Sequence, residues 1–139
     1  MIDFEVQGVE LPNLDYDKVR DWLHDVAADY GFAIGALHYI FCNDDRILEV
    51  NRQFLQHDYY TDVITFDYTK DYVLSGDIFI SLDTVSDNAK IAKVDITNEL
   101  CRIIVHGLLH LTGQGDKTPK TKREMTRKEN LALRKLSER

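Results

Sequence analysis

A helix predicted over residues 98–111 constrains the fold more than any other part of the chain. Apolar side chains lie on nearly every side of its helical projection, at Leu100, Cys101, Ile103, Ile104, Val105, Leu108, Leu109 and Leu111. A helix that is apolar all round is buried. We therefore expect the other elements to pack around it, and we expect Thr97 to be its N-cap.

Two histidines near the end of this helix, His106 and His110, are four residues apart. That spacing places them one turn apart on the same face, with rings free to converge on one point. Gly113 falls where helices often end in a left-handed residue, and residues 114–115 permit a reversal that brings the Asp116 carboxylate back. Two imidazoles and one carboxylate leave a coordination position open, which is typical of a catalytic zinc site.

The same spacing matches that of the metzincin metalloproteases, which carry a glutamate directly after the first histidine as general base. Gly107 occupies that position here, so peptide hydrolysis by that route is not expected. An iron enzyme that uses two histidines and one carboxylate is another interpretation, but nothing else in the sequence indicates redox chemistry.

The length of 139 residues predicts one domain, spanning residues 1–139, with a core that needs no disulfides. Cys42 and Cys101 are therefore expected to be reduced and buried. No apolar run approaches the roughly 20 residues of a membrane span, and the acidic start MIDFEVQG is unlike a signal peptide. We expect a cytoplasmic protein with no membrane partner.

Charge is distributed unevenly along the chain. Residues 1–116 hold 8 basic and 21 acidic side chains, whereas residues 117–139 hold 9 basic and 3 acidic ones. A basic tail therefore follows the predicted metal site, although such a stretch is more often only a solvated helical face.

The remaining periodicities predict a set of strands and helices. Strands are expected at residues 2–6, 34–42, 62–68 and 77–82. Helices are expected at residues 15–30, 43–56, 83–93 and 120–136, the last with Thr118 and Pro119 as cap and first-turn residue. The predicted fold class is α+β, with a small mixed sheet packed with helices and the metal-binding helix at the centre.

Three stretches, in order, resemble the YbeY endoribonuclease family. Residues 50–66, VNRQFLQHDYYTDVITF, are similar to a family segment of Leu-Asn, an aromatic residue, an arginine and then Thr-Asp-Val-Leu-Ser-Phe. The second stretch is GDIFIS at residues 76–81. The third and most specific is the metal motif, matched at His106, Gly107, Leu109, His110, Leu111 and Gly113. The resemblance covers most of the chain from about Leu48 onward.

The resemblance implies a zincin-like fold and a zinc-dependent endoribonuclease that acts in ribosomal RNA maturation and ribosome quality control. Single-stranded ribosomal RNA and a ribosomal subunit or its associated proteins would be the partners. His106 and His110 would bind Zn²⁺, with Asp116 in place of the family's third histidine and Gln114 and Gly115 in place of its Tyr-Asp. A carboxylate is an accepted zinc ligand, but its charge should raise the pKa of bound water above roughly 7.

A second departure from the family is Leu55, which stands where the family commonly has an arginine that serves phosphate chemistry. Arg52, one turn earlier, and Arg102, one turn before His106, are the candidate catalytic replacements. Glu99 would lie roughly 10 Å along the helix from His106, too far for direct proton transfer, and is expected to complement the helix N-terminus.

RNA binding would need cations and stacking surfaces near the site. The candidates are Lys117, Lys120, Lys122, Arg123, Tyr59, Tyr60, Tyr68 and Tyr72. A site role is possible for His57, whereas none is expected for His24 or His38. The alternative function is a ribosome-associated assembly factor with a mainly structural metal and little catalysis.

Overall fold

The computed structural model describes residues 1–55 and 62–139, and these contain one four-stranded sheet. The strand order is β1 (Ile2–Val6), β2 (Ala33–Cys42), β4 (Val73–Ser81) and β3 (Val63–Asp67). The first three strands are parallel, and β3 runs antiparallel to β4. The predicted mixed sheet is therefore confirmed. β4 begins earlier than the predicted residue 77, because Val73 and Leu74 pair with Ala33 and Ile34 of β2.

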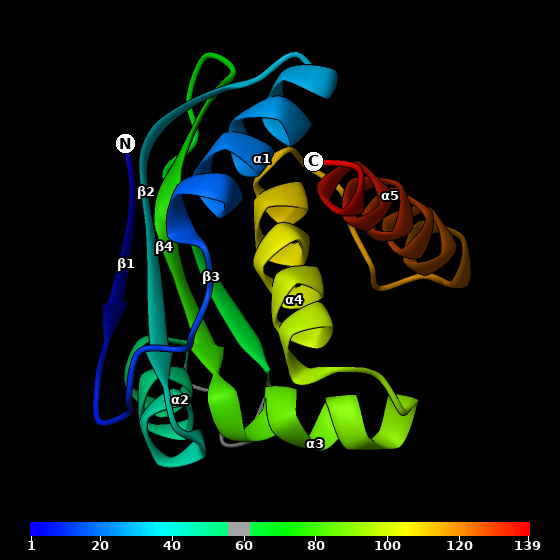
Figure 1. The fold of residues 1–139 in the computed structure, drawn as a ribbon. Coiled ribbons are helices and arrows are strands. Elements are labelled where there is room, and N and C mark those ends of the chain that lie inside the picture. Colours follow the sequence, from blue (N-terminus) through cyan, green and yellow to red (C-terminus); the bar gives the residue numbers. More distant parts are fainter. Residues whose placement is uncertain (56–61) are drawn as a thin grey trace.

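The described residues also contain five α-helices, most of which lie to one side of the sheet (Figure 1). They are α1 (Tyr16–Asp29), α2 (Asp44–Val50), α3 (Leu82–Ala92), α4 (Ile96–Leu111) and α5 (Pro119–Ser137), and a π-helical turn, η1 (Asn51–Leu55), continues α2. Helices α1 and α4 lie against one face of the sheet, and α5 packs on their outer side. The predicted α+β architecture with a central metal helix is confirmed.

The start of α4 differs from the prediction. Its N-cap is Asp95, whose carboxylate accepts a hydrogen bond of 2.7 Å from the main-chain N–H of Thr97. Asp and Thr are both good N-caps. The helix begins at Ile96, so its cap is Asp95, and the prediction of Thr97 as cap was wrong by two residues.

Gly107 explains how closely α4 approaches the sheet. A Cβ atom at this position would lie 3.0 Å from Cγ2 of Ile78 on β4, tighter than ordinary contact. The position that a metzincin uses for its catalytic glutamate therefore faces the hydrocarbon core. A glutamate there could not reach the solvent side of the two histidines.

Buried hydrogen bonds tie the outer elements to α4 and α5. The Tyr39 hydroxyl donates to the main-chain oxygen of Ile104 at 2.8 Å, joining β2 to α4. The Trp22 indole N–H donates to the main-chain oxygen of Ala132 at 2.7 Å, joining α1 to α5. These bonds satisfy polar atoms of fully buried aromatic rings and fix the position of α5 relative to the core.

The sequence prediction for the two cysteines is met in the core. Cys42 and Cys101 are both free and buried. Gly76, in the GDIFIS stretch, permits the close pairing of β3 and β4, since a Cβ there would come within 2.3 Å of the Phe66 carbonyl oxygen. None of the described helices is both long and apolar enough to cross a bilayer.

Candidate metal centre

The last two turns of α4 bring His106 and His110 together as the sequence predicts. Their ring centroids are 4.6 Å apart and the ring planes are nearly perpendicular, at 87°. Nε2 of each ring lies 3.3 Å from the same oxygen, Oδ2 of Asp116. The three side chains are partly buried, so their polar atoms converge at the edge of the core rather than in open solvent.

A tight turn after α4 returns the chain to the histidines. Gly113 has a φ of +99°, a conformation that favours glycine, and its N–H donates to the His110 carbonyl at 3.0 Å. The buried Gln114 side chain donates to the main-chain oxygens of Gly115, at 2.9 Å, and Thr121, at 3.2 Å. The turn is thereby anchored to the first turn of α5, and Asp116 is held in place between them.

The three groups form a donor set that can hold a metal ion. One ligand atom from each of His106, His110 and Asp116 lies within 4.8 Å of the others. Two imidazole nitrogens and one carboxylate oxygen are the donor types that zinc takes in catalytic sites, where a fourth position stays open. The residues present therefore fit a metal, and they are the three that the sequence predicted.

A fourth site residue, Glu129 of α5, was not found from the sequence. It is buried, and its Oε2 lies 2.5 Å from Nδ1 of His106. Its sequence signal is its place in the buried stripe of α5, between Met125 and Ala132. A carboxylate in such a stripe must find a partner, but the stripe alone does not say which one.

Arg102, one of the two predicted catalytic residues, forms an ion pair with Glu129. Its Nη1 donates to Oε1 of Glu129 at 2.9 Å, and its Nη2 donates to Oδ1 of Asn130 at 2.8 Å. Arg102 therefore connects to His106 through Glu129. Arg52, the other predicted catalytic residue, is an exposed side chain in η1, as is Leu55.

The other residues considered from the sequence have varied outcomes. Tyr68 and Tyr72 are exposed, and Lys117, Lys120, Lys122 and Arg123 form an exposed basic run at the start of α5. His24 is exposed on α1, whereas His38 lies 3.5 Å from Asp3 on the neighbouring strand. His57, Tyr59 and Tyr60 lie outside the described residues.

The two ring environments shift the histidine pKa values in opposite directions. Burial lowers the pKa of His106, but the hydrogen bond and charge of Glu129, with the charges of Asp116 and Asp62, outweigh it and raise that pKa. Burial and the neighbouring His106 lower the pKa of His110. The site therefore favours a neutral His110 and binds a proton more readily at His106.

Glu99, in the first turn of α4, is influenced by other acidic side chains. Burial raises the pKa of this carboxyl, and the charges of Asp62 and Glu129 raise it further against the opposing effect of Arg102. Glu99 thus lies in the first turn, as expected. The charged groups that act on it are Arg102, Glu129 and Asp62, and Asp62 directly precedes β3.

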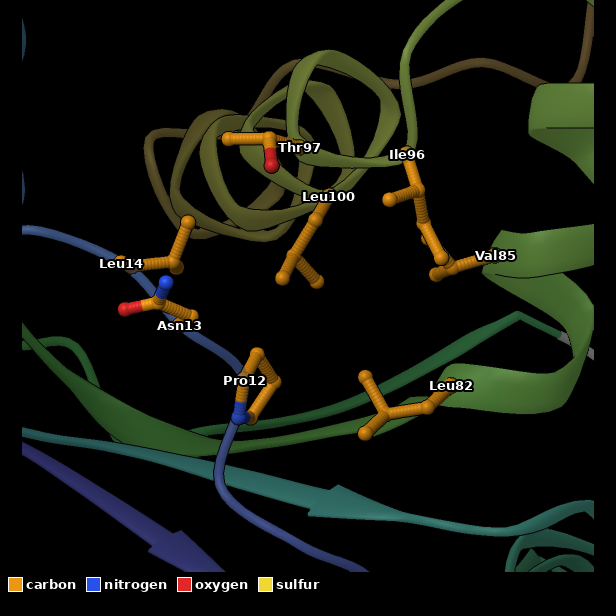
Figure 2. Close-up of a pocket in the computed structure, with 8 residues that line it drawn as sticks. All are labelled: Pro12, Asn13, Leu14, Leu82, Val85, Ile96, Thr97 and Leu100. Carbon is orange, nitrogen blue, oxygen red and sulfur yellow. The ribbon is translucent and has the colours of Figure 1, made fainter.

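A separate apolar pocket lies at the opposite end of α4 (Figure 2). It has a volume of about 300 Å³ and is lined mainly by hydrocarbon, from Pro12, Leu14, Leu82, Val85, Ile96 and Leu100. Its polar lining is limited to Asn13 and Thr97. Neither side chain is an acid, a base or a strong nucleophile, so this pocket offers no hydrolytic chemistry.

Comparisons with known proteins identify the family. The family model for Endoribonuclease YbeY matches residues 2–137. A YbeY endoribonuclease from Phocaeicola vulgatus is 50% identical over 137 residues, covering 99% of both chains. One from Bacteroides thetaiotaomicron is 49% identical over 132 residues, covering 95% of this chain and 96% of its own.

A solved structure shares the fold. The solution structure of TM1509 from Thermotoga maritima superimposes with a TM-score of 0.69 at 24% identity, over 98% of this chain and 89% of that one. The chain belongs to the endoribonuclease YbeY family. The resemblance drawn from the three sequence stretches is confirmed, and with it the prediction of an enzyme of the hydrolytic nuclease class.

Proposed function

We propose that this chain is a zinc-dependent endoribonuclease of the cytoplasm that cuts single-stranded regions of ribosomal RNA during ribosome maturation and quality control. A ribosomal subunit or its associated proteins would present that RNA. The observation that carries the proposal is the convergence of His106, His110 and Asp116, with ligand atoms within 4.8 Å of one another. The family membership supports the RNA substrate class.

Zinc is the proposed ion because the donor set combines two imidazoles with one carboxylate. When bound, zinc would polarise a phosphate oxygen and lower the pKa of a coordinated water, which are the two contributions that phosphodiester hydrolysis needs. The histidines would supply their Nε2 atoms, since these face Asp116. Asp116 adds a negative charge that an all-histidine site lacks.

The surrounding residues would serve RNA binding and support. The basic run from Lys117 to Arg123 begins directly after Asp116, so it can meet phosphates of a strand that crosses the site. Arg52 is the proposed phosphate contact from η1. Arg102 is the proposed support for the site, through its ion pair with Glu129.

Two measurements test this proposal. Elemental analysis of protein purified without added metal should find about one zinc per chain, and the protein should cut single-stranded RNA in a zinc-dependent way. His110→Ala should lose both properties, because it removes one of three ligands. A variant that still bound one zinc and still cut RNA would contradict the ligand assignment.

The second candidate function is a ribosome-associated assembly factor with a mainly structural metal. It is favoured by Leu55, an exposed apolar side chain at the position of the family's arginine, and by the engagement of Arg102 with Glu129. Zinc-containing protein that binds ribosomal subunits, but cuts no single-stranded RNA, would support the assembly factor over the nuclease.

A further inference from the structure

Glu129 joins the metal-binding helix to α5 through two different contacts. Its Oε2 lies at hydrogen-bond distance from Nδ1 of His106, 2.5 Å away, and its Oε1 accepts from the Arg102 guanidinium at 2.9 Å. The carboxylate side chain is only 9% exposed, so both contacts lie away from bulk solvent. A buried carboxylate with each oxygen bonded to a different partner is held in one orientation.

We propose that Glu129 is a positioning residue of the metal centre, which fixes His106 in the tautomer that can bind a metal. An imidazole that donates from Nδ1 to a carboxylate has its proton on Nδ1, so the lone pair of Nε2 is free. That Nε2 atom is the one that faces Asp116, at 3.3 Å. Carboxylate partners of this kind orient ligating histidines and make them more basic. The inference rests on the metal site proposed above.

Arg102 has a defined part in this arrangement. Its bond to Oε1 leaves Oε2 of Glu129 for His106, and its second bond, to Asn130, fixes the guanidinium on α5. Arg102 is therefore proposed to hold the carboxylate and not to contact RNA. This replaces its predicted role in phosphate chemistry with one that acts through a neighbour.

The second histidine provides an internal comparison. His110 lies beside the turn after α4, where the main chain of Gln114, a group that carries no net charge and that side-chain substitution does not remove, raises the pKa of the ring. A change at Glu129 should therefore weaken His106 directly and act on His110 only through the adjacent His106 ring. The alternative is that Glu129 only joins α4 to α5, in which case its loss would lower stability without changing metal affinity in the folded protein.

The experiment compares Glu129→Gln and Glu129→Leu with the wild-type chain. Gln keeps the shape and one acceptor oxygen but removes the charge, whereas Leu removes the acceptor as well. The zinc dissociation constant is measured by competition with a chromophoric chelator. We expect it to rise about 10-fold for Gln and up to about 100-fold for Leu, the range found when such partners are removed.

Glu124→Gln is the matched control. Glu124 lies on the same helix and loses the same charge, but its side chain has no hydrogen bond or ion pair within the described part of the chain. Its zinc dissociation constant should stay within about twofold of wild type. Urea unfolding of the metal-free proteins separates any loss of stability from the loss of metal affinity.

Nitrogen-detected NMR of the histidine rings gives a readout that does not depend on zinc. Above its pKa, His106 of the metal-free wild type should carry its proton on Nδ1, and Glu129→Leu should shift it toward Nε2. If the wild-type protein does not bind zinc, the proposed metal site is contradicted. The His106 tautomer, measured in the same metal-free sample, would still decide whether Glu129 positions the ring.

Zinc affinities of both Glu129 variants within twofold of wild type would overturn the inference, and so would an unchanged His106 tautomer. If neither variant folds, Arg102→Met tests the same arrangement, because Arg102 contacts Glu129 and Asn130 but neither histidine. A rise of about threefold or more in its zinc dissociation constant supports the proposal, and an unchanged constant overturns it.

Discussion

The two histidines of the metal centre share one helix and one Asp116 oxygen, yet they face different surroundings. His106 faces α5, where Glu129 bonds to its ring and Arg102 bonds to Glu129. His110 faces the turn after α4, where the main chain of Gln114 and the carboxylate of Asp116 raise its pKa against burial and the adjacent ring. One ligand is thus supported by side chains from a distant helix, and the other by local backbone.

This difference teaches that a metal motif does not make its ligands equivalent. The carboxylates around His106, Glu129 first among them, raise its pKa despite burial. Burial and the adjacent His106 ring lower the pKa of His110. Changes to α5 should therefore act on the site through charge and hydrogen bonding. Changes to the turn should act through backbone geometry.

The largest expected effect comes from removing either histidine, because each supplies one of the three proposed ligand atoms. His106→Ala and His110→Ala should each weaken zinc binding by more than about 100-fold, beyond the cost of losing a supporting partner. Chelator competition measures this, with His24→Ala, an exposed histidine on α1, as the control. Wild-type zinc affinity in either variant would contradict the assignment of that ring as a ligand.

Gly113→Ala tests the contribution of the turn that follows α4. With a φ of +99°, an alanine there is strained and should lower the free energy of unfolding by about 1–3 kcal/mol. It should also weaken zinc binding, because the turn positions Asp116. Urea unfolding and chelator competition check both effects.

Gly115→Ala is the control for the turn, since its Cβ would meet only Thr121 at ordinary contact distance, 3.9 Å. It should leave both measurements nearly unchanged. If Gly113→Ala behaved in the same way, backbone geometry would not be what supports the His110 side.

The order of protonation is a smaller effect that sharpens the comparison. In metal-free protein, His106 should bind its proton at higher pH than His110, because its pKa is raised and that of His110 is lowered. His106 then contributes stability below its unfolded pKa of about 6.5, which is lost as pH rises through its folded pKa. His110 contributes in the opposite sense, with stability that is lost on acidification. NMR titration of the two Cε1–H signals measures the order, and the reverse order would contradict it.

The smallest expected effect concerns Glu99, in the first turn of α4, whose pKa the Glu129 charge of α5 helps to raise. Its raised pKa means that ionisation is disfavoured in the folded state, so the group stabilises the fold below its unfolded pKa and this contribution is lost as pH rises. Glu99→Gln should therefore raise the free energy of unfolding at pH 7 by about 0.5 kcal/mol, the scale of a mild substitution. The gain should vanish near pH 4. A loss of stability at pH 7 would show that the charge of Glu99 is needed by Arg102.

The sequence alone determined much of this protein. Hydrophobic periodicity located the strands and helices, and apolar residues around all sides of α4 identified it as the buried element. The spacing of His106, His110 and Asp116 predicted a convergence that the structure shows. These features are local, because helix geometry and one short turn are enough to specify them.

Only the tertiary structure decided what surrounds the ligands. Glu129 is 23 residues from His106 and on another helix, so no local spacing could pair them. The packing of α5 against α1 and α4 brings its stripe to the site, turns Arg102 toward Glu129 and makes the two histidines unequal. The physical reason is that a periodic pattern specifies which face of a helix is buried, but the residue that this face meets depends on how the helices pack.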